Sequence, residues 1–311
     1  MNAAPVELTL DDTVGASLTA PALLVALSGL FDVANVATTA LDHLAAGPMA
    51  VVVGEIDPDP FFDFTVERPS VEFVDERRVV TWPQNAFQVV RTGGRHDLVV
   101  LSGVEPHLSW RTFVDCLSWV VERIGVELVV TLGATADVVP HTRAPIVVGS
   151  TTDAEIAAAR GLVAPAYEGV TGLLGVLHSA LAAAGVPSVS LRVGVPHYMA
   201  MVEHPRAVQS LLRHLAHVID VPVTIDLGEA IQRWDEVHDS ALADDPKLQT
   251  YVRILEAEHD RRTEAAVASG DDLAARFEDY LRAAGETADD ESATDDPDDD
   301  AEAGGSDQGA G

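Results

Sequence analysis

Two short apolar runs, separated by a polar segment, constrain the fold more than any other feature of the sequence. The runs cover residues 128–132 and 146–148 and contain β-branched residues without alternating polar ones. Such runs are typical of strands that helices cover on both faces. The segment between them contains His141, Thr142 and Arg143. Because ligands and partners of open α/β sheets bind beyond the carboxyl ends of the strands, we expect this segment to line any site that the chain has.

Strand-like and helical segments alternate along the first two thirds of the chain. Buried strands are expected at residues 22–27, 50–56, 98–103, 126–132, 146–148 and 188–195, and helices at residues 33–46, 107–124, 153–160, 170–184 and 205–219. The first two strands and the helix between them predict a right-handed parallel unit. Thr131 and Gly133 are expected at the end of their strand. The alternation as a whole predicts an α/β fold with a mixed, mainly parallel sheet.

Changes in this pattern give the expected domain boundaries. We expect an N-terminal arm at residues 1–20, either loose or an edge strand, and an α/β core domain at residues 21–224. Within the core, two alternating runs flank a charged turn at residues 75–77. This pattern is typical of a hairpin, so residues 66–92 are expected to form an antiparallel insertion or an extension of the sheet.

The C-terminal part of the sequence has a different character. Amphipathic stretches at residues 227–239, 248–260 and 273–284 predict a helical segment over residues 225–285. Residues 286–311 contain eleven acidic residues, no basic residue and almost no large apolar group. Such a segment cannot bury enough surface to offset the entropy of ordering, so we expect a disordered acidic tail.

Charge and cysteine content disfavour several classes of protein. A net charge of −31 argues against binding to nucleic acid or to an anionic membrane. The single cysteine, Cys116, excludes a disulfide framework and fits a reducing compartment. Residues 1–22 contain no Lys or Arg, which argues against a secretory signal. The reducing setting leads us to expect a cytoplasmic protein. No apolar run approaches the ~20 residues needed to span a bilayer, so no membrane span is expected.

Polar residues that follow the expected strands form the candidate site. Arg143 is suited to bidentate binding of a carboxylate or phosphate, with His141 and Thr142 beside it. The alternative is a structural loop, in which Arg143 bonds backbone carbonyls or a carboxylate such as Asp137. The candidate pocket or interface consists of Asp32, Glu105, Trp110, His141, Thr142, Arg143, Tyr167, Gly172, His197 and Tyr198.

The sequence contains no complete catalytic motif. There is no Gly-x-Ser-x-Gly elbow, no Gly-x-Gly-x-x-Gly after the first strand, and no Gly-Lys-Ser/Thr after the glycines of residues 171–175. The histidines also lack the spacing of a metal motif. No catalytic residue, cofactor or metal is therefore predicted. The alternative is a small-molecule binding protein or a hydrolase- or transferase-type enzyme that uses the strand-end residues Asp32, Glu105, His141, Arg143 and His197.

Six motifs follow one another along the chain. They are Glu-Pro at 105–106 with Trp-Arg-Thr-Phe at 110–113, Val-Val-Thr-Leu-Gly-Ala at 129–134, Val-Pro-His-Thr-Arg at 139–143, Tyr-Glu-Gly-Val-Thr-Gly at 167–172, Gly-Val-Pro-Ser-Val-Ser-Leu at 185–191 and Val-Pro-His-Tyr at 195–198. In this order they resemble the prokaryotic branch of the proteasome assembly chaperone family, in particular its actinobacterial members. The resemblance covers residues 20–265.

The resemblance implies a three-layer, phosphorylase/hydrolase-like α/β fold with a mixed sheet, followed by C-terminal helices. It also implies self-association, with a homotrimer as the favoured state. Relatives in eukaryotes and archaea assist assembly of the proteasome core, which makes proteasome subunits candidate partners. The family has no agreed catalytic set. We therefore expect a non-enzymatic, oligomeric assembly or scaffold protein that acts by protein–protein contacts.

The sequence departs from the family pattern at three places. Val170 stands where relatives often have proline, and Ala144 separates Arg143 from Pro145 where many relatives have proline directly after the arginine. Some assembly factors dock through a C-terminal hydrophobic-Tyr-x motif. Residues 308–311 read Gln-Gly-Ala-Gly, so we do not expect docking in that way.

Overall fold

The computed structural model of the chain describes residues 4–11, 13–47, 50–222, 225–243 and 245–264. The chain divides into two compact units, Met1–Glu256 and Ala257–Gly311. The first unit contains the sheet and all the candidate residues. In the second unit the described residues, 257–264, are helical.

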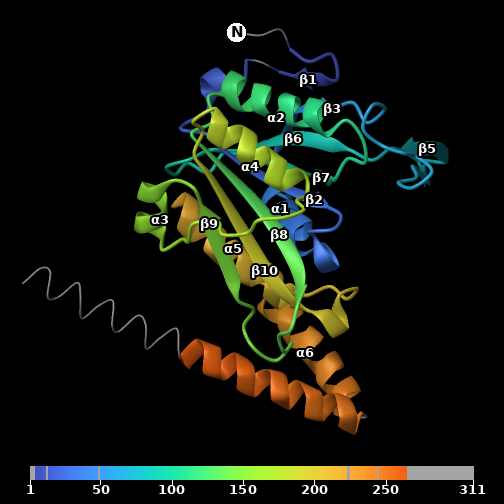
Figure 1. Ribbon diagram of the computed structural model, residues 1–311. Helices are drawn as coiled ribbons and strands as arrows, with labels where there is room; N and C mark the ends of the chain where they lie inside the picture. The colour runs from blue at the N-terminus through green and yellow to red at the C-terminus, as the bar shows by residue number, and fades with distance from the viewer. Residues whose placement is uncertain (1–3, 12, 48–49, 223–224, 244, 265–311) are drawn as a thin grey trace, which may run out of the picture. The chain divides into compact units, whose positions relative to one another are not determined.

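An eight-stranded sheet, counted over the described residues, forms the centre of the first unit (Figure 1). Its strand order is β1-β3-β6-β7-β2-β8-β10-β9. The strands are β1 (Leu8–Leu10), β2 (Ala22–Ser28), β3 (Val51–Ile56), β6 (Asn85–Val90), β7 (Leu98–Val104), β8 (Leu128–Asp137), β9 (Val147–Thr151) and β10 (Ser188–Pro196). The neighbours β7, β2, β8 and β10 are parallel, and the outer strands pair antiparallel. The predicted α/β class with a mixed, mainly parallel sheet is confirmed.

Helices cover both faces of this sheet and give the fold three layers. The α-helices are α1 (Val36–Ala45), α2 (Trp110–Ile124), α3 (Ala154–Arg160), α4 (Leu173–Ala183), α5 (Pro205–Ile219) and α6 (Gly228–Ala243), and the 3-10 turns are η1 (Gly15–Ser17), η2 (Val33–Asn35) and η3 (His197–Met199). A further helix spans residues 246–264. Helices α1 and α5 pack on one face, and α2 and α4 pack on the other. The helix predicted at residues 205–219 coincides with α5.

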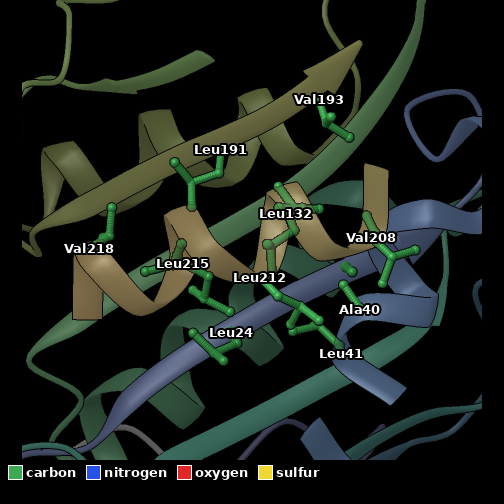
Figure 2. Close-up of a cluster of buried hydrophobic side chains, with 14 of the residues drawn as sticks. Leu24, Ala40, Leu41, Leu132, Leu191, Val193, Val208, Leu212, Leu215 and Val218 are labelled. Atoms are coloured by element: carbon green, nitrogen blue, oxygen red, sulfur yellow. The ribbon is translucent and has the colours of Figure 1, made fainter. Parts of the chain in front are cut away.

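The apolar core consists of one cluster on each face of the sheet. Successive side chains of a strand point to opposite faces. In β2, therefore, Leu24 packs with α1 and α5, whereas Leu23 and Val25 pack with α2 and α4. Figure 2 shows the first cluster, in which Leu212 and Leu215 of α5 lie close to the strand side chains. Complete burial of one such leucine is worth roughly 1.5–3 kcal/mol, which explains why β2 has no polar alternation.

The predicted parallel unit of residues 22–27 and 50–56 is right in strand direction, because β2 and β3 run parallel in one sheet, but the two strands are not neighbours. Strand β3 pairs antiparallel with β1 and β6, and β6 and β7 lie between β3 and β2. Strand β3 is also not buried, since Val51 and Val52 are 59% and 61% exposed. The short connection from β6 to β7 places these two strands beside β2 as an antiparallel pair, which leaves only an outer position for β3.

Burial on both faces is confirmed for residues 128–132 but is wrong for residues 146–148, although residues 147 and 148 do belong to a strand. Residues 128–132 are buried inside β8. The other run contributes to β9, an edge strand antiparallel to β10, where Val148 is 49% exposed. Thr131 and Gly133 lie inside β8, which continues to Asp137, and not at its end.

Residues 66–92 contain both an insertion and an extension of the sheet. Strands β4 (Ser70–Val74) and β5 (Arg77–Thr81) form a separate two-stranded hairpin, and β6 joins the main sheet. The turn residues Asp75 and Glu76 both have positive φ, 49° and 64°, as a two-residue hairpin turn requires. Figure 1 shows β5 projecting away from the main sheet.

Towards both ends of the described chain, the structure contains elements that the sequence predicted. Within residues 1–20, β1 forms an edge strand that pairs with β3, which is one of the two expected alternatives. The stretches predicted at residues 227–239 and 248–260 are helical. The third stretch, residues 273–284, and the acidic tail lie outside the described residues. Within the described part of the chain, no helix combines the length and the apolar character needed to cross a bilayer.

Candidate functional site

The candidate residues do not gather at a single rim. Glu105, Tyr167 and Gly172 lie at the start of α4. His141, Thr142, Arg143, His197 and Tyr198 form a second group, joined by hydrogen bonds and ring contacts to the helix of residues 246–264. Asp32 and Trp110 belong to neither group, because each forms local contacts of its own.

Asp32 holds the start of α1. Its carboxylate is 4% exposed and accepts hydrogen bonds from Ala37 N at 2.6 Å and from the Thr38 hydroxyl at 2.5 Å. These bonds satisfy the free N–H groups at the helix start. Burial raises the pKa of the Asp32 carboxyl, while the bonds from Thr38 and Ala37 oppose that effect.

Glu105 and Gly172 fix the start of α4. The Glu105 Oε1 atom accepts a hydrogen bond from Leu173 N at 3.1 Å. A Cβ atom added to Gly172 would lie 2.7 Å from the ring of Phe31 and 3.3 Å from Glu105 Oε1. Because no side chain fits there without displacing its neighbours, glycine lets the helix start approach the loop after β2.

Tyr167 and Trp110 differ in their surroundings. The Tyr167 side chain is 73% exposed, and its hydroxyl donates to the Val170 carbonyl at 3.0 Å. Trp110 is partly buried against the core of the α2 face, and its indole N–H donates to the Pro106 carbonyl at 2.6 Å. Tyr167 is therefore available at the surface, whereas Trp110 serves packing.

His141 and Tyr198 form a buried pair. His141 is 3% exposed, its backbone N–H donates to the Tyr198 hydroxyl oxygen at 3.0 Å, and its Nδ1 lies 2.8 Å from the same oxygen. The hydroxyl of Tyr198 thus bonds both to the backbone and to the ring of His141. Burial lowers the pKa of His141 and raises the pKa of Tyr198 to about 12. Both side chains are therefore held neutral.

His197 joins the end of β8 to the helix of residues 246–264. Its Nδ1 lies 3.1 Å from the Asp137 carbonyl, and its Nε2 lies 3.2 Å from the Tyr251 hydroxyl. The rings of His197 and Tyr198 meet edge to face at 5.4 Å. His141 and His197 thus both contact Tyr198, but the ring nitrogens of His197 are engaged with the backbone and with a tyrosine.

Thr142 and Arg143 bind Glu256 of the same helix. The Thr142 hydroxyl donates to Glu256 Oε1 at 2.5 Å, and Arg143 Nη1 donates to the same oxygen at 3.1 Å. The structural alternative considered for Arg143 therefore has the expected chemistry but a different carboxylate, since the partner is Glu256 and not Asp137.

Sequence reasoning missed several polar residues beside these groups. His204 is 1% exposed, stacks on Trp234 at 4.6 Å and accepts a hydrogen bond from Ala207 N through Nδ1. Burial lowers its pKa to about 4, with Arg206 adding to the effect. The position of His204 directly before the first proline of a helix was the available sequence signal for a cap.

A second missed set lines a cavity of about 310 Å³ on the α4 face of β8 and β10. Tyr167 and Gly172 are the only candidate residues among its lining residues, which also include His178, Ser190 and Arg192. The sequence signal for this set was Arg192, a charged residue inside an otherwise apolar strand. Charged residues are rare in central strands unless they have a polar environment.

The described residues support neither a metal site nor a reactive thiol. Among the residues that the structure describes, no three His, Cys, Asp or Glu side chains are grouped so that they could hold a metal ion. Cys116 is fully buried in α2, and burial raises its pKa to about 12. A thiol with so high a pKa is a poor nucleophile.

These contacts define a three-layer α/β protein in which most candidate side chains hold one element against another. The chain belongs to the PAC2 family, whose sequence profile matches residues 26–242. The family resemblance expected from the six motifs is thereby confirmed. None of the curated proteins matches the chain.

Several solved structures are similar to this chain. A PAC2 family protein from Streptomyces avermitilis is 39% identical with a TM-score of 0.68, and the match covers 75% of this chain and 99% of that one. A proteasome-assembly chaperone homologue from Mycobacterium tuberculosis is 37% identical with a TM-score of 0.67, over 74% of this chain and 99% of that one. PbaB, a proteasome activator from Pyrococcus furiosus, is 15% identical with a TM-score of 0.57, over 75% and 97%. At that identity it shares the fold alone.

Proposed function

We propose that the chain is a cytoplasmic, non-enzymatic assembly or scaffold protein that forms a homo-oligomer, with a trimer as the favoured state. The solved relative named as a proteasome-assembly chaperone homologue supports proteasome subunits as its partners. The observation that carries the proposal is the exposed apolar hairpin of β4 and β5.

The hairpin presents apolar side chains without cover from the rest of the described chain. Val71 and Val80 pair across its two strands and are 44% and 47% exposed, and Phe73 on the same face is 75% exposed. An isolated two-stranded hairpin is marginally stable in water, and contiguous exposed apolar patches mark contact sites. These properties support a protein surface packed on this face in the working assembly.

The charge of the hairpin region supports a second copy of the chain as the occupant. Residues 66–92 contain four acidic and four basic residues, in a chain with a net charge of −31. Copies of so acidic a chain repel one another over most of their surface, and the repulsion is weakest where the local charge is zero.

The contacts of the candidate residues favour a scaffold over an enzyme. A general base or nucleophile needs an atom that is free to meet a substrate. Both ring nitrogens of His197, one ring nitrogen of His141 and the carboxylate of Asp32 instead bond to neighbouring elements. The alternative of an enzyme that uses Asp32, Glu105, His141, Arg143 and His197 is therefore less well supported.

Affinity purification from native lysate, followed by mass spectrometry, tests the proposal. The tagged chain is expected to recover untagged copies of itself and proteasome subunits. Phe73→Glu is expected to lower the recovery of untagged copies at least tenfold, because a carboxylate opposes burial of the hairpin face. Val6→Glu is the matched control, since Val6 is an apolar residue that is 94% exposed elsewhere.

Two outcomes count against the proposal. Recovery of no proteasome subunit, together with normal proteasome assembly in a deletion strain, contradicts the proteasome part. Equal recovery of untagged copies by wild type and Phe73→Glu contradicts the role of the hairpin in self-association.

A further inference from the structure

We propose that the cavity between α4 and the strands β8 and β10 binds a small organic monocarboxylate, with Arg192 as the charged contact. This site goes beyond the proposed scaffold function and involves none of the hairpin residues. The cavity has a volume of about 310 Å³, which is enough for a ring or short chain of several carbon atoms.

Arg192 is the charge that selects an anion. Its side chain lines the cavity, and within the described part of the chain it forms no hydrogen bond and no ion pair. The side chain of Arg192 is exposed, so its guanidinium is open to an anion from solution. Guanidinium groups bind planar carboxylates through two parallel hydrogen bonds, and this geometry is free at Arg192.

Gly133 of β8 leaves room for the side chain of Arg192. Arg192 lies opposite Gly133 in the parallel pairing of β10 with β8. A Cβ atom added to Gly133 would lie 3.1 Å from the Phe31 carbonyl oxygen and 3.5 Å from Cγ of Arg192. A larger residue at position 133 would crowd both the loop after β2 and the stem of the arginine.

Ser190 supplies a second free polar group at the same place. Residues 190 and 192 are two apart in β10, so both side chains point to the α4 face. The Ser190 hydroxyl, like Arg192, lines the cavity and bonds to no group among the described residues. A carboxylate held by the guanidinium can therefore accept a further hydrogen bond from this serine.

The remaining polar groups of the cavity are neutral and already paired. Thr131 Oγ1 lies 2.7 Å from His178 Nε2, and His178 Nδ1 lies 3.0 Å from Ser188 Oγ. Burial and the nearby Arg192 lower the pKa of His178 to about 4, so the ring is uncharged at neutral pH. Arg192 is consequently the single positive charge of the cavity.

The charge balance favours a monoanion over a phosphate ester. A phosphate group with about −1.5 to −2 charges is usually held by several cationic or N–H donors. Here the N–H of Leu173 at the start of α4 is already bonded to the Glu105 carboxylate, whose negative charge repels a dianion more strongly than a monoanion. The side chains of Phe31, Leu174 and Tyr167 also line the cavity and provide apolar contacts for the body of an organic acid.

Calorimetric titration of the full chain with benzoate tests this site. Benzoate is expected to bind, whereas benzamide, which has the same shape without the charge, binds at least tenfold more weakly. Arg192→Leu is expected to weaken benzoate binding at least tenfold, and Ser190→Ala severalfold. Arg192→Lys keeps the charge but not the two parallel donors, so we expect an intermediate affinity.

The matched control is Arg213→Leu, which removes an exposed arginine of α5 that bonds to no described residue. It is expected to bind benzoate as wild type does. The proposal is overturned if benzoate and benzamide bind equally, if Arg192→Leu retains wild-type affinity, or if Arg213→Leu weakens binding as much. Tighter binding of inorganic phosphate than of benzoate would also overturn it, because the cavity would then prefer a dianion.

Discussion

Buried imidazole rings form much of the polar interior of this protein. His204 and His178 each bond through a ring nitrogen to the start of a helix or to a strand hydroxyl. Within the described residues, the Nε2 atoms of His141 and His204 are buried without a hydrogen-bond partner. A buried polar atom without a partner is costly, and a charged ring at these positions would be more costly still.

These rings predict a loss of stability in mild acid. The pKa values of His178 and His204 are lowered to about 4, whereas the value in an unfolded chain is about 6.5. Between these values the unfolded chain binds more protons than the folded one. The contribution of the two rings to the free energy of unfolding is therefore complete above about pH 6.5 and is lost as the pH falls towards 4.

Urea unfolding at pH 7, 6 and 5 measures this effect. His204→Gln is expected to reduce the fall in the free energy of unfolding between pH 7 and 5, because one proton uptake is removed. His214→Gln, at an exposed position of α5, is expected to keep the wild-type pH dependence. A pH dependence that is the same in wild type and His204→Gln contradicts this account.

At the level of residues, the local sequence predicts candidate side chains but not the residues that they contact. His141, Arg143 and His197 were recognisable because they follow apolar strands. The partners of His197 and Arg143, Tyr251 and Glu256, lie more than fifty positions further along the chain, in a helix with no motif of its own. Only the folded chain brings these groups together, so contact partners could not be derived from spacing.

At the level of elements, local patterns predict where strands and helices occur but not which strands pair. The runs of β2, β8 and β10 were recognised because helices cover both of their faces. Strand β3 has a similar apolar run, yet it lies near the edge of the sheet beside the short β1. The antiparallel pair of β6 and β7 occupies the positions between β3 and β2.

The pairing of β1 with β3 predicts a strict requirement for glycine. A Cβ atom added to Gly54 would lie 2.4 Å from the Thr9 backbone carbonyl oxygen of β1. Because the contact is to backbone, Gly54→Ala is expected to displace β1 and to lower the free energy of unfolding by about 1–3 kcal/mol. Hydrogen exchange at Leu8–Leu10 should become faster.

Gly47→Ala is the appropriate control for this variant. A Cβ atom added to Gly47 has no neighbour within 4 Å, so we expect a change within roughly 0.5 kcal/mol. Unchanged exchange in β1 of Gly54→Ala would mean that β1 does not depend on this close approach.

At the level of the whole molecule, a strongly acidic chain carries an apolar hairpin in a region whose net charge is zero. Residues 66–92 have no net charge, and Phe73 is the most exposed aromatic side chain of their hairpin. An acidic surface keeps copies apart except where such a patch allows contact, which favours one defined assembly over general aggregation. This combination supports the proposed self-association and is independent of the acid-binding cavity.

The particle mass in solution tests the proposed self-association most directly. Light scattering coupled to size-exclusion chromatography should give three times the 32.9 kDa mass of one chain for wild type and for Val6→Glu. Phe73→Glu should elute at the mass of a single chain. A wild-type protein that runs as a monomer, or a Phe73→Glu variant with the wild-type mass, would contradict the account.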